Sequence, residues 1–502
     1  MAGRGQRTLC RYPSPLARRA LLLAAALALL LTGCRTGTRP PVPAPTTIQQ
    51  MVDAAAPGSV VAVPPGIYRE TVTITKPLTL VGRPGAEIRG SDLWTSWTPS
   101  GRVWLGGTLP DFPHRTVPCL ASSNGRCGWP EQVFFDGRPL FQVGGDPGPG
   151  QFAISSTRRL ILGENPAGHT VEVTTRQHWI VGAAPDVTIE GFTMRDAASP
   201  PQEGAIENNG YANWTVERNT LSDAAGAVIF LRGASGLRVL HNDIARGGQE
   251  GISLDQTRGA ALEDNTIHDN NTEEFDPTWE AGGVKITRST GTVVSGNVID
   301  QNFGAGLWFD IGCVGATVTG NRVHDNADTG ISYEVSHDGT ISGNAVWENG
   351  WGDPSTLGAA GILLSSADHT VVSQNVLAWN VSGVTVLSQR RADASPVVDD
   401  VVRDNVIAAT DDFSPGNRFA LRWVEDYPGM LYRPASNNQG LDNRFWSPAT
   451  AASVPRFHWT TDLADLAAFA QTPGGRGSTS LTATQKDQLL GAAGVPTVEE
   501  HR

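Results

Sequence analysis

A short tag of asparagine, any residue and an apolar residue recurs along the middle of the chain. Its eight copies begin at Asn219 and end with the copy at Asn405, and successive copies are 23, 23, 32, 24, 23, 31 and 30 residues apart. A unit of this size that repeats and is sometimes lengthened is typical of a solenoid, in which each unit packs mainly against its neighbours. The repeat therefore restricts this part of the chain to a stack of similar coils.

The composition of each unit decides between two kinds of solenoid. Each unit contains glycine, a short apolar alternation, a polar turn, a second short alternation and the Asn tag, and the leucine ladder of leucine-rich repeats is absent. Strands of about three to five residues fit this pattern and a helix does not. We predict a parallel β-helix whose equivalent strands stack about 4.8 Å apart. The tag asparagines should form a structural ladder at an inward turn.

The stretch before the repeats begins with "TTIQQMVDAAAPG", which predicts a capped helix with Ile48, Met51 and Val52 on one face. Short strands separated by Pro and Gly follow it. This start resembles the N-terminal cap of the right-handed parallel β-helix superfamily that includes the pectin lyases, and the resemblance covers most of residues 46–405. Between residues 91 and 175 the repeat stops, and the alternation there is typical of antiparallel strands.

The resemblance and this interruption together predict the fold class and the division of the chain. The fold is all-β, a right-handed parallel β-helix solenoid with an inserted β-sandwich-like domain. The predicted parts are a signal peptide (1–33), a lipidated tether (34–45), an N-terminal cap with the first coils (46–90), the inserted domain (91–175), the β-helix with a catalytic face (176–410), and a C-terminal cap and tail (411–502).

The N-terminal residues predict export. Residues 1–33 combine five Arg, an apolar run too short for a resident membrane helix, and small residues. The junction that ends at Cys34 resembles a bacterial lipobox, which implies a lipid on Cys34 and attachment to the outer face of the bacterial cell membrane. An ordinary secretory signal with a chance cysteine is the alternative. In an exported chain we expect Cys119 and Cys127 to form a disulfide, and Cys313 to be a buried free thiol.

Net charge limits the partners. The formal charge is −12, and without residues 1–33 the chain has 33 basic and 50 acidic residues. Nucleic acid is not an expected partner because the basic surface that it needs is missing. We expect a carbohydrate-binding monomer without a cofactor, and structural Ca²⁺ at a turn stays open.

Two units contain an acid at the same position. The segments Gly306-Leu-Trp-Phe-Asp310 and Gly330-Ile-Ser-Tyr-Glu334 are 24 residues apart. Strand alternation places the apolar residues of both segments inward, and Asp310 and Glu334 on one outer face. Stacked strands bring the two carboxyl groups to about 5 Å, the spacing of a retaining glycosidase. Their mutual repulsion should also help one acid to keep a proton near neutral pH.

Two lengthened units should form the walls of a groove around this pair. The extra residues lie within 270–283 and 348–361, each just before an outer strand. The predicted substrate-binding residues are Trp308, Asp255, Trp279, Glu280 and Trp351. Lys285, one coil before Trp308, is predicted either to bind a sugar hydroxyl or to lower the pKa of Asp310.

The block from Leu307 to Gly339, "LWFDI…ISYEVSHDG", resembles the catalytic stretch of bacterial β-helix β-xylosidases. This resemblance implies that Asp310 is the nucleophile, that Glu334 is the acid/base, and that His337 orients or tunes Glu334. We therefore predict a retaining glycoside hydrolase acting on an extracellular or cell-wall glycan. Open alternatives for the protein are a glycan-binding lipoprotein and a polysaccharide lyase; for the acid pair they are a metal site and a solvated surface.

Overall fold

The computed structural model describes residues 47–391, 396–410, 418–426, 430–448 and 454–499. The chain separates into the units Met1–Pro45 and Thr46–Arg502. The predicted signal peptide, Cys34 and the tether lie outside the described residues. No helix in the described part of the chain is long and apolar enough to cross a membrane.

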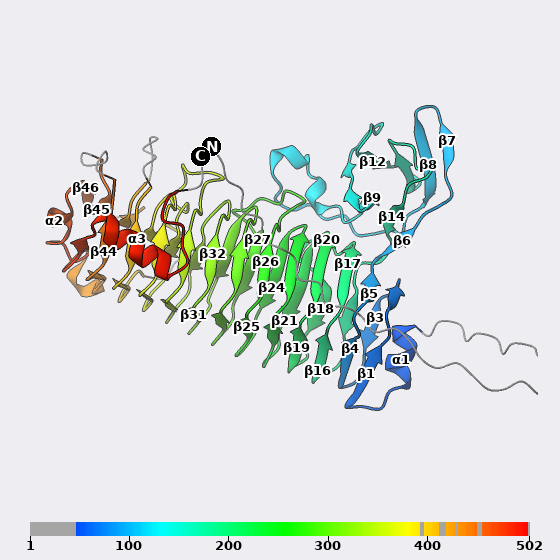
Figure 1. Cartoon of the computed structure of the whole chain (residues 1–502), viewed down its shortest axis with the longest axis horizontal. Helices are drawn as coiled ribbons and strands as arrows, with labels where there is room; N and C mark the ends of the chain where they lie inside the picture. Colours follow the sequence, from blue (N-terminus) through cyan, green and yellow to red (C-terminus); the bar gives the residue numbers. More distant parts are fainter. Residues whose placement is uncertain (1–46, 392–395, 411–417, 427–429, 449–453, 500–502) are drawn as a thin grey trace, which may run out of the picture. The chain divides into compact units, whose positions relative to one another are not determined.

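Three long sheets wind together as a parallel β-helix (Figure 1). Sheet 1 has 12 strands and runs from β1 (Ser59–Val63) to β43 (Gln439–Leu441), and sheet 3 has 13 strands and runs from β2 (Gly66–Tyr68) to β47 (Thr479–Ser480). Sheet 2, also of 13 strands, carries the predicted site. Its strands are, in order, β3 (Val72–Ile74), β15 (Ile180–Gly182), β18 (Gly204–Asn209), β21 (Ala227–Arg232), β24 (Glu250–Asp255), β27 (Gly282–Thr287), β30 (Ala305–Asp310), β33 (Ile331–Glu334), β36 (Ile362–Ser365), β39 (Val384–Ser388), β42 (Leu421–Glu425), β45 (Phe457–Trp459) and β46 (Thr461–Leu463).

Apolar side chains fill the interior of the coils at every level. In sheet 2, Val284, Leu307, Ile331 and Ile362 occupy equivalent positions of successive strands and are all buried. Each such column removes apolar surface from water, which favours the stack by about 25 cal/mol per Å² buried. The inward alternation predicted from the sequence is confirmed.

The tag asparagines form the predicted ladder. The side-chain carbonyl of Asn344 accepts hydrogen bonds from the backbone N–H and the side-chain amide of Asn321, at 3.0 and 2.9 Å, and this pattern continues from coil to coil. A second ladder, which we did not predict, runs along another turn through Asn270, Asn302, Asn326, Asn349 and Asn380. Both ladders satisfy buried backbone and side-chain groups at turns, where strand pairing is not available.

The N-terminal end of the stack is closed by α1 (Ile48–Ala54). Thr47 caps this helix by accepting a hydrogen bond from the backbone of Gln50, and Ile48 and Val52 are buried against the first strands. The capped helix predicted from the sequence is confirmed. It covers apolar edges that the first coil would otherwise expose.

The coils continue beyond residue 410, where we expected an irregular cap to begin. Parallel pairing extends through β42, β44 (Arg444–Trp446) and β45 to β47. Beyond β46, α2 (Leu466–Phe469) places Phe469 in a stack on Phe457 at the end of the core. The helix α3 (Ala483–Ala492) and the segment after it lie along sheet 3, where the Trp379 indole donates to the carbonyl of Pro496. The boundary predicted at residue 411 therefore falls within the stack, because the last coils lack the regular tag spacing.

The inserted domain consists of two small sheets around its own apolar core. One contains β10 (Arg138–Pro139), β9 (Val133–Phe135), β14 (Val171–Thr174) and β6 (Ser91–Leu93). The other contains β11 (Phe141–Gln142), β12 (Gln151–Ile154), β13 (Arg159–Leu162), β8 (Val103–Thr108) and β7 (Thr98–Ser100). The pairings are antiparallel apart from β11 with β12. The β-sandwich-like insertion is therefore present.

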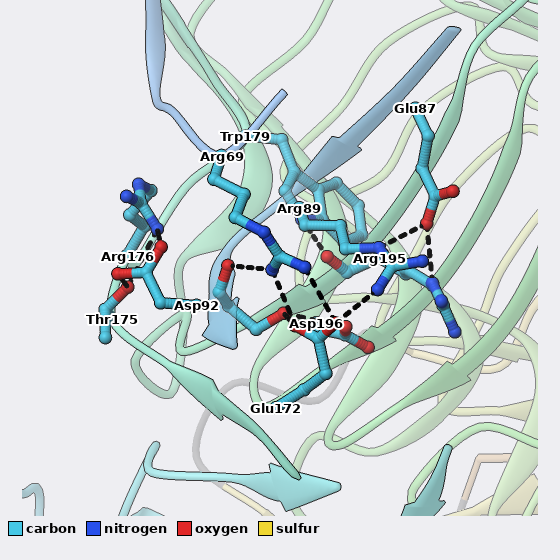
Figure 2. A network of polar contacts seen from close by, with 11 residues as sticks. Arg69, Glu87, Arg89, Asp92, Glu172, Thr175, Arg176, Trp179, Arg195 and Asp196 are labelled. Atoms are coloured by element: carbon cyan, nitrogen blue, oxygen red, sulfur yellow. Dashed lines mark hydrogen bonds and ion pairs between the residues drawn. The ribbon is translucent and has the colours of Figure 1, made fainter. Parts of the chain in front are cut away.

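A network of charged residues joins the root of the insertion to the first coils (Figure 2). Glu172 accepts hydrogen bonds from Arg69 and Arg89, and the Ser91 hydroxyl lies between the carboxyl groups of Glu172 and Asp196. Burial raises the pKa of Asp196 to about 6, against the effects of the Arg195 charge and the Ser91 hydroxyl. These contacts connect both ends of the insertion to the β-helix at one place.

Candidate active site

Asp310 and Glu334 end neighbouring parallel strands, β30 and β33. Leu307, Trp308 and Phe309 pair with Ile331, Ser332 and Tyr333, so the next position in this register is Asp310 beside Glu334. Strands at this spacing lie about 4.8 Å apart. The register of the two strands therefore places the two acids side by side, as predicted.

Lys285 and Asp310 form a buried ion pair. The Lys285 ammonium lies 2.9 Å from Asp310 Oδ2, and the two side chains are only 3% and 10% exposed. The same ammonium lies 2.9 Å from the centre of the Trp308 ring. Asp310 Oδ1 is buried without a hydrogen-bond partner. One carboxylate oxygen is thus fixed, and the other keeps its full capacity to interact with a further atom.

Glu334 has a different environment from Asp310. Its Oε2 accepts a hydrogen bond of 3.1 Å from the Trp308 indole, and its Oε1 pairs with Arg391. Burial raises the pKa of Glu334, and the negative charge of Asp310 raises it further, whereas Arg391, Lys285 and the Trp308 bond act in the opposite direction. The net rise favours a protonated carboxyl, the form that a general acid needs.

The backbone turns sharply after each of these acids. Ile311 and Val335, which follow Asp310 and Glu334, have φ angles of 52° and 45°. β-branched residues are rare in this left-handed region, and such conformations cost about 1–3 kcal/mol. The turn ends each strand directly after its acid and so fixes where the carboxyl groups lie.

A cavity of about 540 Å³ lies over the outer face of these coils. Trp308, Ser332 and Glu334 contribute to its lining from the strands. The first long loop (270–283) contributes residues 276–278, and the second long loop (348–361) contributes residues 352, 353, 356 and 358. Both lengthened units therefore border the cavity. Asp310 does not line it, but lies two residues beyond Trp308 on the same strand.

Several predicted substrate-binding residues lie elsewhere. The Trp351 indole donates to the carbonyl of Trp379 and lies under the guanidinium of Arg418, and Trp279 packs against the cluster that contains Phe275. Neither indole lines the cavity. Alternation could not predict these orientations because both tryptophans are in loops.

Asp255 and Glu280 are also absent from the cavity lining. Asp255 accepts hydrogen bonds from Thr287 and Arg288, at 2.9 and 2.8 Å, and these partners account for its burial. Burial raises the pKa of Glu250 to about 8, and the negative charge of the neighbouring Glu280 contributes to this rise. The hydrogen bonds of Asp255 agree with a structural role.

His337 lies in the turn after Glu334 and contacts a different acid. Its Nδ1 is 2.8 Å from Asp368 Oδ1, and its backbone carbonyl accepts a hydrogen bond from the Tyr333 hydroxyl. Among the described residues, the ring makes no hydrogen bond to Glu334. In the described part of the chain no direct contact therefore supports the predicted orienting or tuning of Glu334 by His337, because the ring pairs with Asp368 of the next coil.

Three residues of this region were missed in the sequence. Arg391 is 57 positions from Glu334, and no motif links the two. Asp328 lines the cavity, and burial together with the Asp353 charge raises its pKa against the hydrogen bonds from Thr329. Leu120, from the inserted domain, also lines the cavity. Only Asp328 could have been recognised from the sequence, because it is an acid two residues before Gly330, the Gly that precedes the Glu334 strand.

The insertion reaches the cavity through a cross-linked loop. Cys119 and Cys127 form a disulfide, with their Cα atoms 5.9 Å apart. The backbone of Leu120 donates to the carbonyl of Glu274, and the backbone of Asp276 donates to the carbonyl of Pro118. This segment is thereby fixed to the first long loop. Cys313 is a buried free thiol, as predicted.

No group of three or more His, Cys, Asp or Glu side chains is arranged to hold a metal ion in the described ranges.

Comparison with known proteins identifies the fold. The family model for the right-handed β-helix region matches residues 168–310, 204–377 and 281–416. A solved complex of XylC with xylose is 17% identical, with a TM-score of 0.54 over 80% of this chain and 72% of that one. The A-module of mannuronan C-5 epimerase AlgE6 from Azotobacter vinelandii is 14% identical (TM-score 0.48; 87% and 94% coverage). The catalytic unit of a GH87 α-1,3-glucanase from Streptomyces thermodiastaticus is 12% identical (TM-score 0.47; 86% and 64% coverage). A search of curated proteins found no match.

Proposed function

Starting from the fact that this chain is a right-handed parallel β-helix protein, we propose that it is a retaining glycoside hydrolase with Asp310 as nucleophile and Glu334 as acid/base. One observation carries the proposal. Two carboxyl groups, the buried Asp310 and the 12% exposed Glu334, occupy the same position of adjacent strands, and Asp310 has an unpartnered oxygen. Retaining glycosidases hold such groups about 5–5.5 Å apart, whereas inverting enzymes need about 6.5–9.5 Å.

In the first step, Asp310 Oδ1 forms a bond to the anomeric carbon while the bond from that carbon to the leaving oxygen breaks. Lys285 holds the other oxygen, Oδ2, at 2.9 Å, so the unpartnered oxygen is the one available for attack. Asp310 does not line the cavity and its Oδ1 is buried, so the reacting sugar must approach Asp310 from the end of the cavity where Glu334 and Trp308 meet.

Glu334 supplies its proton to the leaving oxygen in the same step. Its raised pKa keeps that proton available at a pH above the ordinary range of a glutamic acid. In the second step the Glu334 carboxylate takes a proton from water, and the water oxygen replaces Asp310 on the anomeric carbon. Each cycle restores both carboxyl groups to their starting states.

The cavity favours an uncharged glycoside as substrate. Asp276, Asp328, Asp353 and Glu334 contribute to its lining, together with apolar groups such as Leu363. Carboxyl groups accept hydrogen bonds from hydroxyls, and they would repel a uronate. Because XylC was solved with xylose, aryl xylosides are the first substrates to test.

The test measures turnover of aryl glycosides and of plant and bacterial wall polysaccharides by residues 35–502. We expect Asp310→Asn and Glu334→Ala to lower turnover by at least about a hundredfold. Asp404→Asn is the matched control, because Asp404 pairs at the surface with its neighbour Arg403, and it should retain activity. Azide should restore Glu334→Ala and give a glycosyl azide with the anomeric configuration of the substrate.

Unchanged turnover in both acid variants would refute the assignment. An azide product of inverted configuration from Glu334→Ala would refute the retaining mechanism. If every substrate bound without turnover, the protein would instead belong to the glycan-binding class.

We further propose that the mature protein is exported and anchored to the outer face of the bacterial cell membrane through a lipid on Cys34. The lipobox-like junction before Cys34 supports this. Cells that express the full chain should retain it in the membrane fraction until detergent is added, whereas Cys34→Ser should prevent lipid labelling. Equal labelling of both forms would contradict the proposal.

A further inference from the structure

A second cavity, of about 240 Å³, lies on the other side of the disulfide loop. The inserted domain contributes Arg126, Gln132 and Phe141 to its lining, and the first long loop contributes Glu273 and Glu274. Residues 276–278 of that loop and Leu120 face the candidate active site instead. The disulfide loop and the first long loop thus separate two cavities with no lining residue in common.

This second cavity has polar groups without partners. Gln132 is only 7% exposed and its Oε1 makes no hydrogen bond, although its amide nitrogen donates to Glu273 at 3.1 Å. Arg126 Nε and Glu274 Oε2 are likewise buried and unpartnered. Buried polar atoms are normally satisfied, so these three indicate that a ligand or ordered water completes the site.

The lining determines which ligand fits. Arg126 provides a donor, and Gln132 and Glu274 provide acceptors, while Phe134, Phe141 and Phe152 provide aromatic surface. The guanidinium of Arg126 lies 5.1 Å from the centre of the Phe141 ring. No acid cluster that could hold a metal ion occurs in the described residues. An anion is disfavoured because Glu131, Glu273, Glu274 and Asp223 outnumber Arg126 and Arg246 in the lining. Mixed donors and acceptors beside aromatic carbon suit an uncharged, hydroxyl-rich ring.

We propose that this cavity is an accessory binding site for a single neutral sugar unit, separate from the candidate active site. Its volume equals that of about eight water molecules, which allows one ring and not a chain. Burial raises the pKa of Glu273, the Glu274 charge raises it further, and the Gln132 amide opposes both. A protonated Glu273 can donate as well as accept, as a sugar hydroxyl does. This inference goes beyond the proposed hydrolysis and does not depend on it.

The experiment uses residues 35–502 carrying Thr356→Trp, which fills the candidate active site from the second loop. Xylose, arabinose and glucose are titrated by calorimetry and by saturation-transfer NMR, with glucuronate as the charged comparison. At least one neutral sugar should bind with a millimolar Kd, and glucuronate should bind at least about tenfold more weakly. Asp310→Asn should not change this binding, which separates the result from any failure of the hydrolase proposal.

Adding Gln132→Met keeps the side-chain volume but removes the amide, and it should weaken binding by about tenfold or more. Phe141→Ala provides a second test, because Phe141 is half exposed and its loss should not prevent folding. Binding that neither substitution changes, or no binding of any neutral sugar at about 50 mM, would overturn the proposal and leave ordered water as the occupant.

Discussion

Replacing Asp196 by Asn should stabilise the protein at neutral pH and not in acid. Asp196 is 2% exposed, and its folded pKa of about 6 lies above the ordinary value of 3.8. Because folding raises this pKa, the stability that the group contributes is complete below about pH 4 and is lost as the pH rises through about 6. An asparagine carries no charge at any pH and avoids this loss.

The magnitude follows from the shift. A rise from 3.8 to about 6 is worth about 3 kcal/mol, at about 1.4 kcal/mol per pKa unit. Asn fits the local backbone, since φ at Asp196 is 62° and Asn adopts this left-handed region more readily than most residues. Its side-chain oxygen can still accept from Ser91. The gain at pH 7.5 relative to pH 4 should therefore approach this value.

The assay compares the unfolding of wild type and Asp196→Asn by denaturant and by heat between pH 4 and pH 8. The matched control is Glu172→Gln in the same network. Burial alone would raise the pKa of Glu172, but bonds from Arg69 and Ser91 and the charge of Arg89 lower it. That variant should lose more stability at pH 7.5 than at pH 4. The reasoning is refuted if the difference between Asp196→Asn and wild type is independent of pH or shrinks as the pH rises.

Three further substitutions test the site and the coils. Arg391→Met removes a positive charge that lowers the pKa of Glu334. The alkaline limb of the pH profile of kcat/KM should therefore move up by about half a pH unit or more. An unchanged limb would contradict the assignment of Glu334 as the acid. Lys285→Met leaves the buried Asp310 without its cation. This variant should lower the free energy of unfolding by about 3–5 kcal/mol and abolish turnover. A fully stable and active variant would show that the pair has no function. Asn321→Ala removes one step of the asparagine ladder. It should lower the free energy of unfolding, measured by chemical denaturation, by about 1–3 kcal/mol and leave KM unchanged. A loss of under about half a kcal/mol would mean that water replaces the amide.

The coils could be predicted because one residue pattern is stacked many times. The tag asparagines have the same environment in each coil. Their spacing in the sequence therefore equals the number of residues in each coil and predicts the stack. The second ladder was equally visible, because Asn302, Asn326, Asn349 and Asn380 each lie five residues after a tag. The tag alone does not reveal it, because the tag describes only one turn of each coil.

The walls of the site could not be predicted in the same way. Alternation fixes the direction of a side chain on a strand, and it located Trp308, Asp310 and Glu334. It does not apply to loops, so it gave no direction for Trp279 or Trp351. Contacts made by the insertion depend on docking between distant segments, which no local pattern encodes.

The arrangement of charge along the outer column argues that the acid pair is more than a solvated surface. The column contains Asp255, Thr287, Asp310, Glu334 and Ser365 in successive strands. A neutral residue separates Asp255 from the next acid, and two arginines pair with it. Asp310 and Glu334 have no such separation, although stacked carboxylates repel by about 3 kcal/mol at an effective dielectric near 20. Lys285 and Arg391 offset part of this cost, yet Asp310 still keeps one oxygen unpartnered. A column selected only for stability would place a neutral residue at one of these two positions, as it does on either side of the pair.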